Sequence, residues 1–291
     1  MLPAVPVLPE SKGVNAMKCE RIHLKELFPK LGEGERDPFV DLYLPYNMVQ
    51  MNRQDQLRPA ILLCPGGGYG MVSEREWEPI VLHLLPMGYN VYVLKYSTKC
   101  PFPTQLREVA AAMELIYSNA AQWNTDTDRI AIMGFSAGGH LACHYSNCYD
   151  CPEVRELFPE SKGVKAAVLC YPVIACDSRY WHIGTFRNLS GHQEPTVEDA
   201  EKYSLQLKVT DRTPPTFLWH TRTDELVPIM NSLLYAQALA EHNVPFALHV
   251  YPNGVHGLAT VDAETCRAVD EKSKLAADWF NQLEKWLKIT L

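Results

Sequence analysis

From Phe39 onward, the chain alternates between short, continuous apolar runs and segments whose apolar residues follow helical spacing. Continuous apolar runs are typical of strands that lie inside a parallel sheet and are covered on both faces. Six such runs span residues 60–64, 91–95, 130–134, 166–171, 216–220 and 246–251. Helical spacing is found over residues 106–117, 226–240 and 275–287. The alternation predicts an α/β fold with a mostly parallel central sheet and helices on both faces.

Two segments interrupt this alternation. Residues 1–17 show no apolar periodicity and include three prolines, so we expect a loose N-terminal extension before a single domain over residues 18–291. Residues 175–215 contain mixed aromatic and polar residues but no clear strand. Because long loops inside a domain are usually functional or disordered, we expect this segment to form an ordered, cap-like insertion near the site.

Composition limits the classes of function. The 291 residues are 47% hydrophobic and carry a formal net charge of −7, which argues against a nucleic-acid partner. No export signal or membrane segment is recognisable, and nine scattered cysteines do not resemble a disulfide framework. We therefore expect a cytoplasmic protein in a reducing compartment, with no membrane partner. The oligomeric state stays open, with a homo-oligomer among the alternatives.

Ser136 stands in the pattern Gly134-Phe135-Ser136-Ala137-Gly138, at the end of an apolar run and before a helical pattern. A serine hydroxyl is a weak nucleophile that needs a base and an oxyanion-stabilising N–H group nearby, and a sharp strand-to-helix turn provides both. Glycine at 134 and 138 avoids clashes in such a turn. The pattern predicts a nucleophile elbow, although short Gly/Ser patterns by themselves also mark ordinary turns.

Candidate partners of Ser136 follow the last two apolar runs. Asp224 comes after the run at 216–220, and His256 comes after the run at 246–251, between Gly254 and Gly257. An imidazole can accept the serine proton, and a carboxylate can orient that imidazole and stabilise its charged form. The chain order Ser, Asp, His is that of α/β-hydrolases and differs from the order in the major serine-protease folds.

Each partner has an alternative role or a competitor. Asp224 could instead be an acid at a helix start, while Asp211 lies too early, before the strand. His140, His220 and His249 compete with His256, but only His256 lies in a loop beyond the last strand.

The segment Pro65-Gly66-Gly67-Gly68-Tyr69 follows a buried run. Consecutive glycines let backbone N–H groups turn toward an anion, and together with the N–H of Ala137 they would form an oxyanion hole. A phosphate-binding loop is the alternative, but the Gly-Lys-Ser/Thr sequence and the dinucleotide fingerprint are both missing.

Residues with metal-ligating side chains also gather after Ser136, namely His140, Cys143, His144, Cys148 and Cys151. Cys148 and Cys151 have the spacing of a zinc-binding pair. However, His140 and His144 lie on the helix that must pack behind Ser136, and no second paired cluster exists. The sequence therefore favours packed side chains and predicts no metal.

Together these motifs resemble those of bacterial esterases of the acetyl-xylan-esterase and carbohydrate-acetylesterase type, which are α/β-hydrolases related to the hormone-sensitive-lipase branch. The resemblance covers residues 17–291 and departs from that branch at Pro65, where histidine is usual. It implies a cofactor-free hydrolase of small acyl esters. By the resemblance, the catalytic residues are Ser136, His256 and Asp224, and the oxyanion donors are Gly67, Gly68 and Ala137.

The expected activity is removal of acetyl or similarly short acyl groups from a small ester substrate, with an acetylated sugar as the favoured type. The short-acyl preference is inferred from bulky residues near the site, namely Tyr69, Met71, Trp77 and Trp181. Residues 185–189, which include Phe186, resemble the cap insertion of the family and are expected to shape the pocket. The alternatives are a prolyl-peptidase-like serine peptidase and a non-catalytic binding protein with the same fold.

Overall fold

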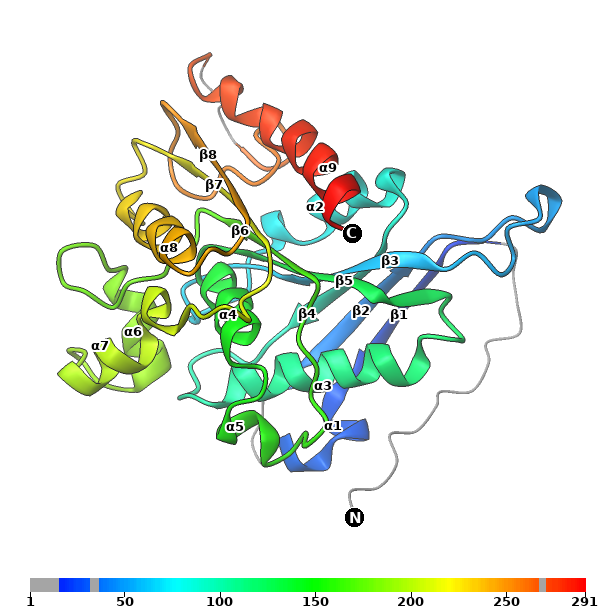
Figure 1. The fold of residues 1–291 in the computed structure, drawn as a ribbon, viewed down its shortest axis with the longest axis horizontal. Coiled ribbons are helices and arrows are strands. Elements are labelled where there is room, and N and C mark those ends of the chain that lie inside the picture. The colour runs from blue at the N-terminus through cyan, green and yellow to red at the C-terminus, as the bar shows by residue number, and fades with distance from the viewer. Residues whose placement is uncertain (1–15, 32–36, 267–270) are drawn as a thin grey trace.

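The structure is a computed structural model that describes residues 16–31, 37–266 and 271–291. Within these residues the chain forms one eight-stranded sheet with the order β1-β2-β4-β3-β5-β6-β7-β8 (Figure 1). The strands are β1 Lys18–His23, β2 Phe39–Leu44, β3 Arg58–Cys64, β4 Asn90–Lys95, β5 Thr125–Phe135, β6 Ala166–Cys170, β7 Thr216–Thr221 and β8 Phe246–Tyr251. All six predicted strands are present. β1 and β2, at one edge, were not predicted.

The sheet is mostly parallel, as predicted. β1 and β2 are antiparallel to their neighbours, whereas β3 to β8 pair in parallel. β3 lies between β4 and β5, so the sequential order of the strands reverses at β3. Such a switch point is where open α/β sheets bind ligands. At this point Cys64 at the end of β3 is paired with Gly134 near the end of β5, so the segments that follow both strands begin side by side.

Nine α-helices surround the sheet in the described part of the chain. They are α1 Leu24–Leu27, α2 Glu78–Leu84, α3 Thr104–Asn119, α4 Ser136–Cys148, α5 Pro152–Arg155, α6 Ile183–Ser190, α7 Val197–Tyr203, α8 Met230–Glu241 and α9 Trp279–Thr290. Short 3-10 turns occupy Pro29–Leu31, Val49–Met51, Glu74–Glu76, Leu85–Met87, Leu205–Lys208 and Ser273–Asp278.

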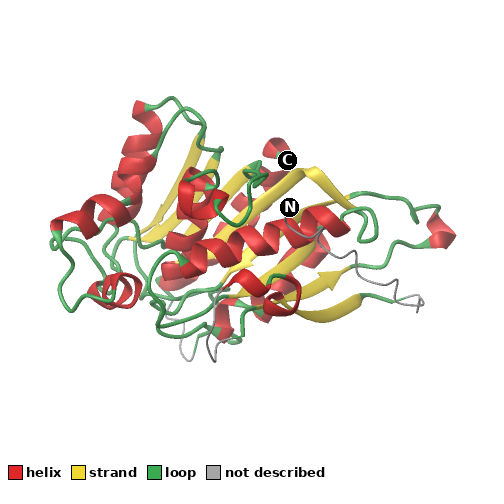
Figure 2. Ribbon diagram, turned by 90° about the horizontal axis from the view of Figure 1, so that it is seen from below, coloured by secondary structure: helices red, strands yellow, loops and turns green. Residues whose placement is uncertain are grey.

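The helices cover both faces of the sheet, and Figure 2 shows the layers from below. Successive residues of a strand point to opposite faces, so Leu62 of β3 belongs to the core that α3, α4 and α8 cover, while Ile61 and Leu63 belong to the core that α2 and α9 cover. Because apolar side chains are buried on both faces, the central strands are continuous apolar runs. β1 is mostly polar and Asp41 interrupts β2, which explains why the search for continuous runs missed them.

The predicted insertion at residues 175–215 is ordered into α6, α7 and a 3-10 turn, which lie together at one end of the sheet (Figure 1). The predicted division into an extension and one domain stays a prediction, and residues 1–15 of that extension lie outside the described residues. None of the helices in the described ranges is long and apolar enough to span a bilayer.

Candidate active site

Ser136 lies at a sharp turn from β5 into α4, with a left-handed φ of 53° and a side chain that is 7% exposed. The flanking glycines are required by close backbone contacts. A Cβ atom on Gly134 would lie 2.1 Å from the carbonyl oxygen of Gly138, and one on Gly138 would lie 2.1 Å from that of Cys64. A left-handed conformation costs a residue with a side chain free energy, and such strain is characteristic of functional turns. The predicted elbow is therefore present.

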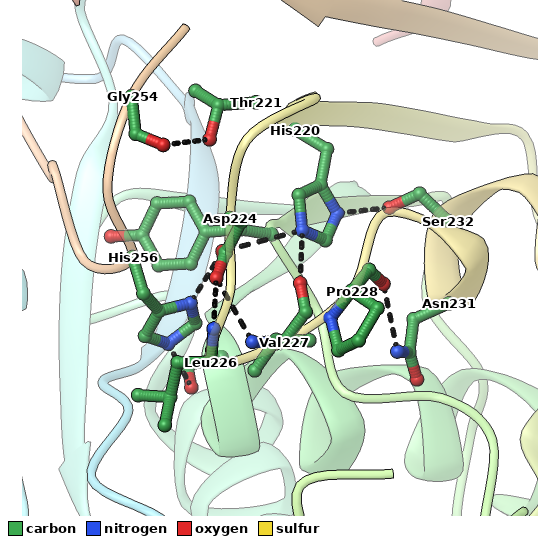
Figure 3. A network of polar contacts seen from close by, with 12 residues as sticks. His220, Thr221, Asp224, Leu226, Val227, Pro228, Asn231, Ser232, Gly254 and His256 are labelled. Atoms are coloured by element: carbon green, nitrogen blue, oxygen red, sulfur yellow. Dashed lines mark hydrogen bonds and ion pairs between the residues drawn. The ribbon is translucent and has the colours of Figure 1, made fainter. Parts of the chain in front are cut away.

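His256 lies between Ser136 and Asp224 and is hydrogen-bonded to both. Its Nε2 atom is 2.8 Å from Oγ of Ser136. Its Nδ1 atom is 2.6 Å from Oδ2 of Asp224 (Figure 3). Because a carboxylate only accepts hydrogen bonds, Nδ1 carries the proton and Nε2 accepts from the serine hydroxyl. The structure thus brings the three predicted residues together from the ends of β5, β7 and β8.

Asp224 is nearly completely buried, yet it is held in its ionised form. Its Oδ1 atom accepts hydrogen bonds from the backbone N–H groups of Leu226 and Val227, at 3.0 and 2.9 Å. Burial alone would raise the pKa of Asp224, but hydrogen bonds from His220, His256 and Val227 outweigh it and hold that pKa well below its usual value. An ionised carboxylate at this position can fix the tautomer of His256 and stabilise its protonated form.

His220, a sequence-level competitor for the role of base, supports Asp224 instead. Its side chain is fully buried, with Nε2 2.9 Å from the carbonyl oxygen of Val227 and 3.4 Å from Oδ2 of Asp224. Since a carbonyl accepts, Nε2 carries the proton, and Nδ1 accepts from the hydroxyl of Ser232 at 2.8 Å. Sequence reasoning missed this supporting role because the spacing His220 to Asp224 has no distinctive motif.

The loop that carries His256 is fastened to the end of β7. The hydroxyl of Thr221 donates to the carbonyl oxygen of Gly254 at 2.9 Å (Figure 3). The N–H of Gly254 donates to the hydroxyl of Thr223, also at 2.9 Å. The ring of Tyr171 meets the imidazole of His256 edge to face, with centroids 5.1 Å apart. These contacts fix the position of the imidazole relative to Asp224.

The glycine loop after β3 adopts a conformation that only glycine tolerates easily. Gly67 and Gly68 have φ values of 124° and 63°, and a Cβ atom on Gly67 would lie 2.2 Å from the carbonyl oxygen of Met71. In the described part of the chain, neither Gly67 nor Gly68 donates its N–H to a protein acceptor. Ala137, in the first turn of α4, lies where N–H groups have no partner within the helix.

Glu76 is a site-supporting residue that the sequence analysis missed. Its carboxylate is 3% exposed and accepts two hydrogen bonds of 2.8 Å, from the N–H of Gly66 and from the hydroxyl of Tyr171. The hydroxyl of Tyr171 in turn accepts from the N–H of Ala259, three residues after His256. One buried carboxylate therefore links the glycine loop to the loop that carries the imidazole.

Two of the predicted substrate contacts are corrected by the structure. Tyr69 is 1% exposed, and its hydroxyl is 3.0 Å from Nδ1 of His140. Nε2 of His140 donates to the carbonyl oxygen of Tyr203, so Nδ1 must accept from Tyr69. Phe186 is fully buried and packs edge to face on His140. Both rings belong to the buried core. Tyr69 joins the glycine loop to α4, and Phe186 joins the cap to α4, because each contacts His140.

The other predicted contacts lie closer to the surface. Met71 is 59% exposed beside the glycine loop, and Trp181 is half-buried against the core on the α4 side of the sheet. Trp77 instead packs on Phe39, with ring centroids 5.7 Å apart. Contact of Met71 and Trp181 with substrate stays a prediction.

The candidate zinc ligands on α4 are packed within the fold. His140 and His144 are both buried, and burial lowers the pKa of His140 to about 4. Within residues 16–31, 37–266 and 271–291, no group of three or more His, Cys, Asp or Glu side chains is arranged to hold a metal ion.

The amino-acid sequence matches a known protein family. Residues 40–239 match the BD-FAE family model, which is more than half of the chain. The chain belongs to the BD-FAE family. Its relatives include endo-1,4-beta-xylanase B of Butyrivibrio fibrisolvens, 38% identical over 76% of this chain and 36% of that protein. Acetylxylan esterase of Xylanibacter ruminicola is 32% identical over 68% of this chain and 40% of that protein.

A solved structure matches over nearly its whole length. The acetyl ester-xyloside bifunctional hydrolase from Caldicellulosiruptor lactoaceticus is 33% identical, with a TM-score of 0.74 over 91% of this chain and 96% of that one. The chain spans only about two fifths or less of the two curated relatives. The resemblance to esterases of the acetyl-xylan-esterase type and the α/β-hydrolase fold are confirmed.

Proposed function

We propose that the chain is a serine esterase that removes acetyl or other short acyl groups from carbohydrate esters. The observation that carries the proposal is the hydrogen-bonded series Ser136–His256–Asp224, at 2.8 and 2.6 Å, beside a glycine loop with unused N–H groups. The carbohydrate part rests on two relatives that are named for acetylxylan and for acetyl ester and xyloside substrates.

In the proposed reaction, Oγ of Ser136 attacks the ester carbonyl while Nε2 of His256 accepts the serine proton. The N–H groups of Gly67, Gly68 and Ala137 stabilise the negative charge on the carbonyl oxygen, each worth about 10²- to 10³-fold in rate. The imidazolium then protonates the leaving alcohol, which departs and leaves an acyl-enzyme. Water, deprotonated by His256, hydrolyses that intermediate and restores the serine hydroxyl.

Initial rates on p-nitrophenyl esters from acetate to octanoate and on an acetylated xylooligosaccharide test this proposal. We expect the highest kcat/KM on acetate, release of acetate from the oligosaccharide, and loss of both activities in Ser136→Ala. A kcat/KM that rises steadily through octanoate would contradict the short-acyl part. Unchanged acetate release by Ser136→Ala would contradict the mechanism.

A further inference from the structure

The N-cap residue His182 and one side of α6 lie against the glycine loop. Nδ2 of Asn188 donates to the carbonyl oxygen of Gly68 at 2.9 Å. A Cβ atom on Gly68 would lie 3.4 Å from Cε1 of His182 and 3.9 Å from Oγ1 of Thr185. His182, Thr185 and Asn188 recur every three residues, which places them on a common side of the helix. The imidazole of His182 thus borders the loop predicted to bind the oxyanion.

The proton positions on His182 follow from Thr185. Nδ1 of His182 is 2.8 Å from Oγ1 of Thr185, and the side chain of Thr185 is fully buried. No other described residue accepts a hydrogen bond from that hydroxyl. A buried hydroxyl without an acceptor is costly, so Thr185 donates and Nδ1 of His182 accepts. Nε2 of His182 therefore carries the proton, and it has no hydrogen-bond partner in the described part of the chain.

Burial lowers the pKa of His182, which keeps the ring neutral and its single N–H available as a donor. During the reaction, the oxygen of the departing alcohol must approach Nε2 of His256, because that atom returns the proton to it. Gly68 belongs to the loop that packs on the nucleophile, since a Cβ atom on Gly66 would lie 3.0 Å from Cβ of Ser136. A donor beside Gly68 is therefore near the bond that breaks, where the alcohol half of the ester departs.

We propose that His182 selects esters of polyhydroxylated alcohols by donating a hydrogen bond from Nε2–H to an oxygen next to the acylated one. This inference deepens the proposed function and rests on it. A sugar presents such a neighbouring hydroxyl, whereas a simple alcohol does not. A site with a donor placed for that oxygen favours the alcohol that satisfies it.

A matched pair of substrates tests the role of His182. Cyclohexyl acetate and trans-2-hydroxycyclohexyl acetate share the acyl group and the ring, and differ in the neighbouring hydroxyl. The readout is the ratio of kcat/KM for the hydroxylated ester to that for the plain ester. In His182→Phe, which keeps a ring without the donor, we expect this ratio to fall about 3- to 10-fold from that of the unsubstituted enzyme. His182→Gln, which can place an amide N–H near Nε2, should restore most of the ratio.

Thr185→Val provides a second, independent test, since it removes the hydroxyl that fixes the tautomer but keeps the side-chain shape. It should lower the same ratio, by less than His182→Phe. Equal losses on both esters in the His182 variants would overturn the proposal, because they would indicate an action on the acyl half or on the fold. An unchanged ratio would also overturn it. Failure of the unsubstituted enzyme on both esters and on p-nitrophenyl acetate would instead contradict the proposed function, and with it this inference.

Discussion

The carboxylate of Glu76 accepts a hydrogen bond from the backbone N–H of Gly66 at 2.8 Å, directly behind the nucleophile. A Cβ atom on Gly66 would lie 3.0 Å from Cβ of Ser136 and 2.6 Å from Oε2 of Glu76. The same carboxylate holds the hydroxyl of Tyr171. The glycine loop and the loop that carries His256 are therefore both held by one buried acid.

Glu76→Gln should reduce activity without touching any reacting group. The amide would present N–H to one of the two donors that the carboxylate now accepts, so one hydrogen bond is lost. We expect kcat to fall about 10- to 100-fold, because small displacements of catalytic groups are costly. The free energy of unfolding should fall by about 1–3 kcal/mol.

Kinetics on p-nitrophenyl acetate and urea denaturation check both parts of this prediction. Glu74→Gln, on the same 3-10 turn but exposed, is the matched control and should leave both quantities near those of the unsubstituted protein. If Glu76→Gln and Glu74→Gln had the same kcat and the same free energy of unfolding, the supporting role of Glu76 would be contradicted.

Tyr69→Phe separates a structural role from a substrate contact. The substitution leaves Nδ1 of His140 without its donor in a fully buried position. We expect a loss of about 1–3 kcal/mol in the free energy of unfolding, with KM for acetate esters unchanged. Denaturation and steady-state kinetics are the measurements, and Tyr180→Phe, at a partly exposed ring, is the control. A raised KM with unchanged stability would restore the substrate role that the sequence suggested.

His140 makes stability depend on pH below neutrality. Its folded-state pKa is about 4, against about 6.5 for an unfolded chain. Between these values the unfolded chain binds a proton that the folded chain does not. The free energy of unfolding is therefore highest with respect to this group above pH 6.5, and it decreases as pH falls toward 4. This residue alone contributes a slope of at most about 1.4 kcal/mol per pH unit.

Urea denaturation at pH 7, 6 and 5 measures that slope. His140→Gln should reduce it, although His144, whose pKa is also lowered well below its usual value by burial, still contributes in the same direction. His242→Gln, at an exposed position, should leave the slope unchanged. A slope that His140→Gln does not alter would count against the buried neutral imidazole.

Asp224→Asn tests the orienting carboxylate. An amide can donate to Nδ1 of His256, which would favour the tautomer with the proton on Nε2 and remove the acceptor for the serine proton. We expect kcat to fall about 10³- to 10⁴-fold with little change in KM. The control variant Asp211→Asn, at an exposed position before β7, should keep the kcat and KM of the unsubstituted enzyme. Comparable kinetics in the two variants would remove Asp224 from the proposed mechanism.

Six of the eight strands in the described residues could be predicted from the sequence, and so could the strand ends that carry Ser136, Asp224 and His256, because each depends on local pattern. Strands buried on both faces are continuous apolar runs, and groups that act together lie just past their ends, as with Asp224 after β7 and His256 after β8. The elbow was readable because Gly134 and Gly138 are dictated by backbone contacts rather than by a distant partner.

Supporting contacts could not be read in the same way. The aromatic rings of Tyr69 and Phe186 suit a pocket wall or a core equally, and only the position of His140 on α4 decides between them. Glu76 resembles its exposed neighbours in sequence, and it becomes distinctive when folding brings Gly66 and Tyr171 to it. His182 likewise gains its place beside Gly68 from the docking of the cap.

Labelling with a fluorophosphonate, followed by peptide mass mapping, tests the central claim that Ser136 is an activated nucleophile. We expect one equivalent of phosphonate on the peptide that contains Ser136, none in Ser136→Ala, and much slower labelling in His256→Gln. Labelling at another residue, or labelling that persists in Ser136→Ala, would contradict it.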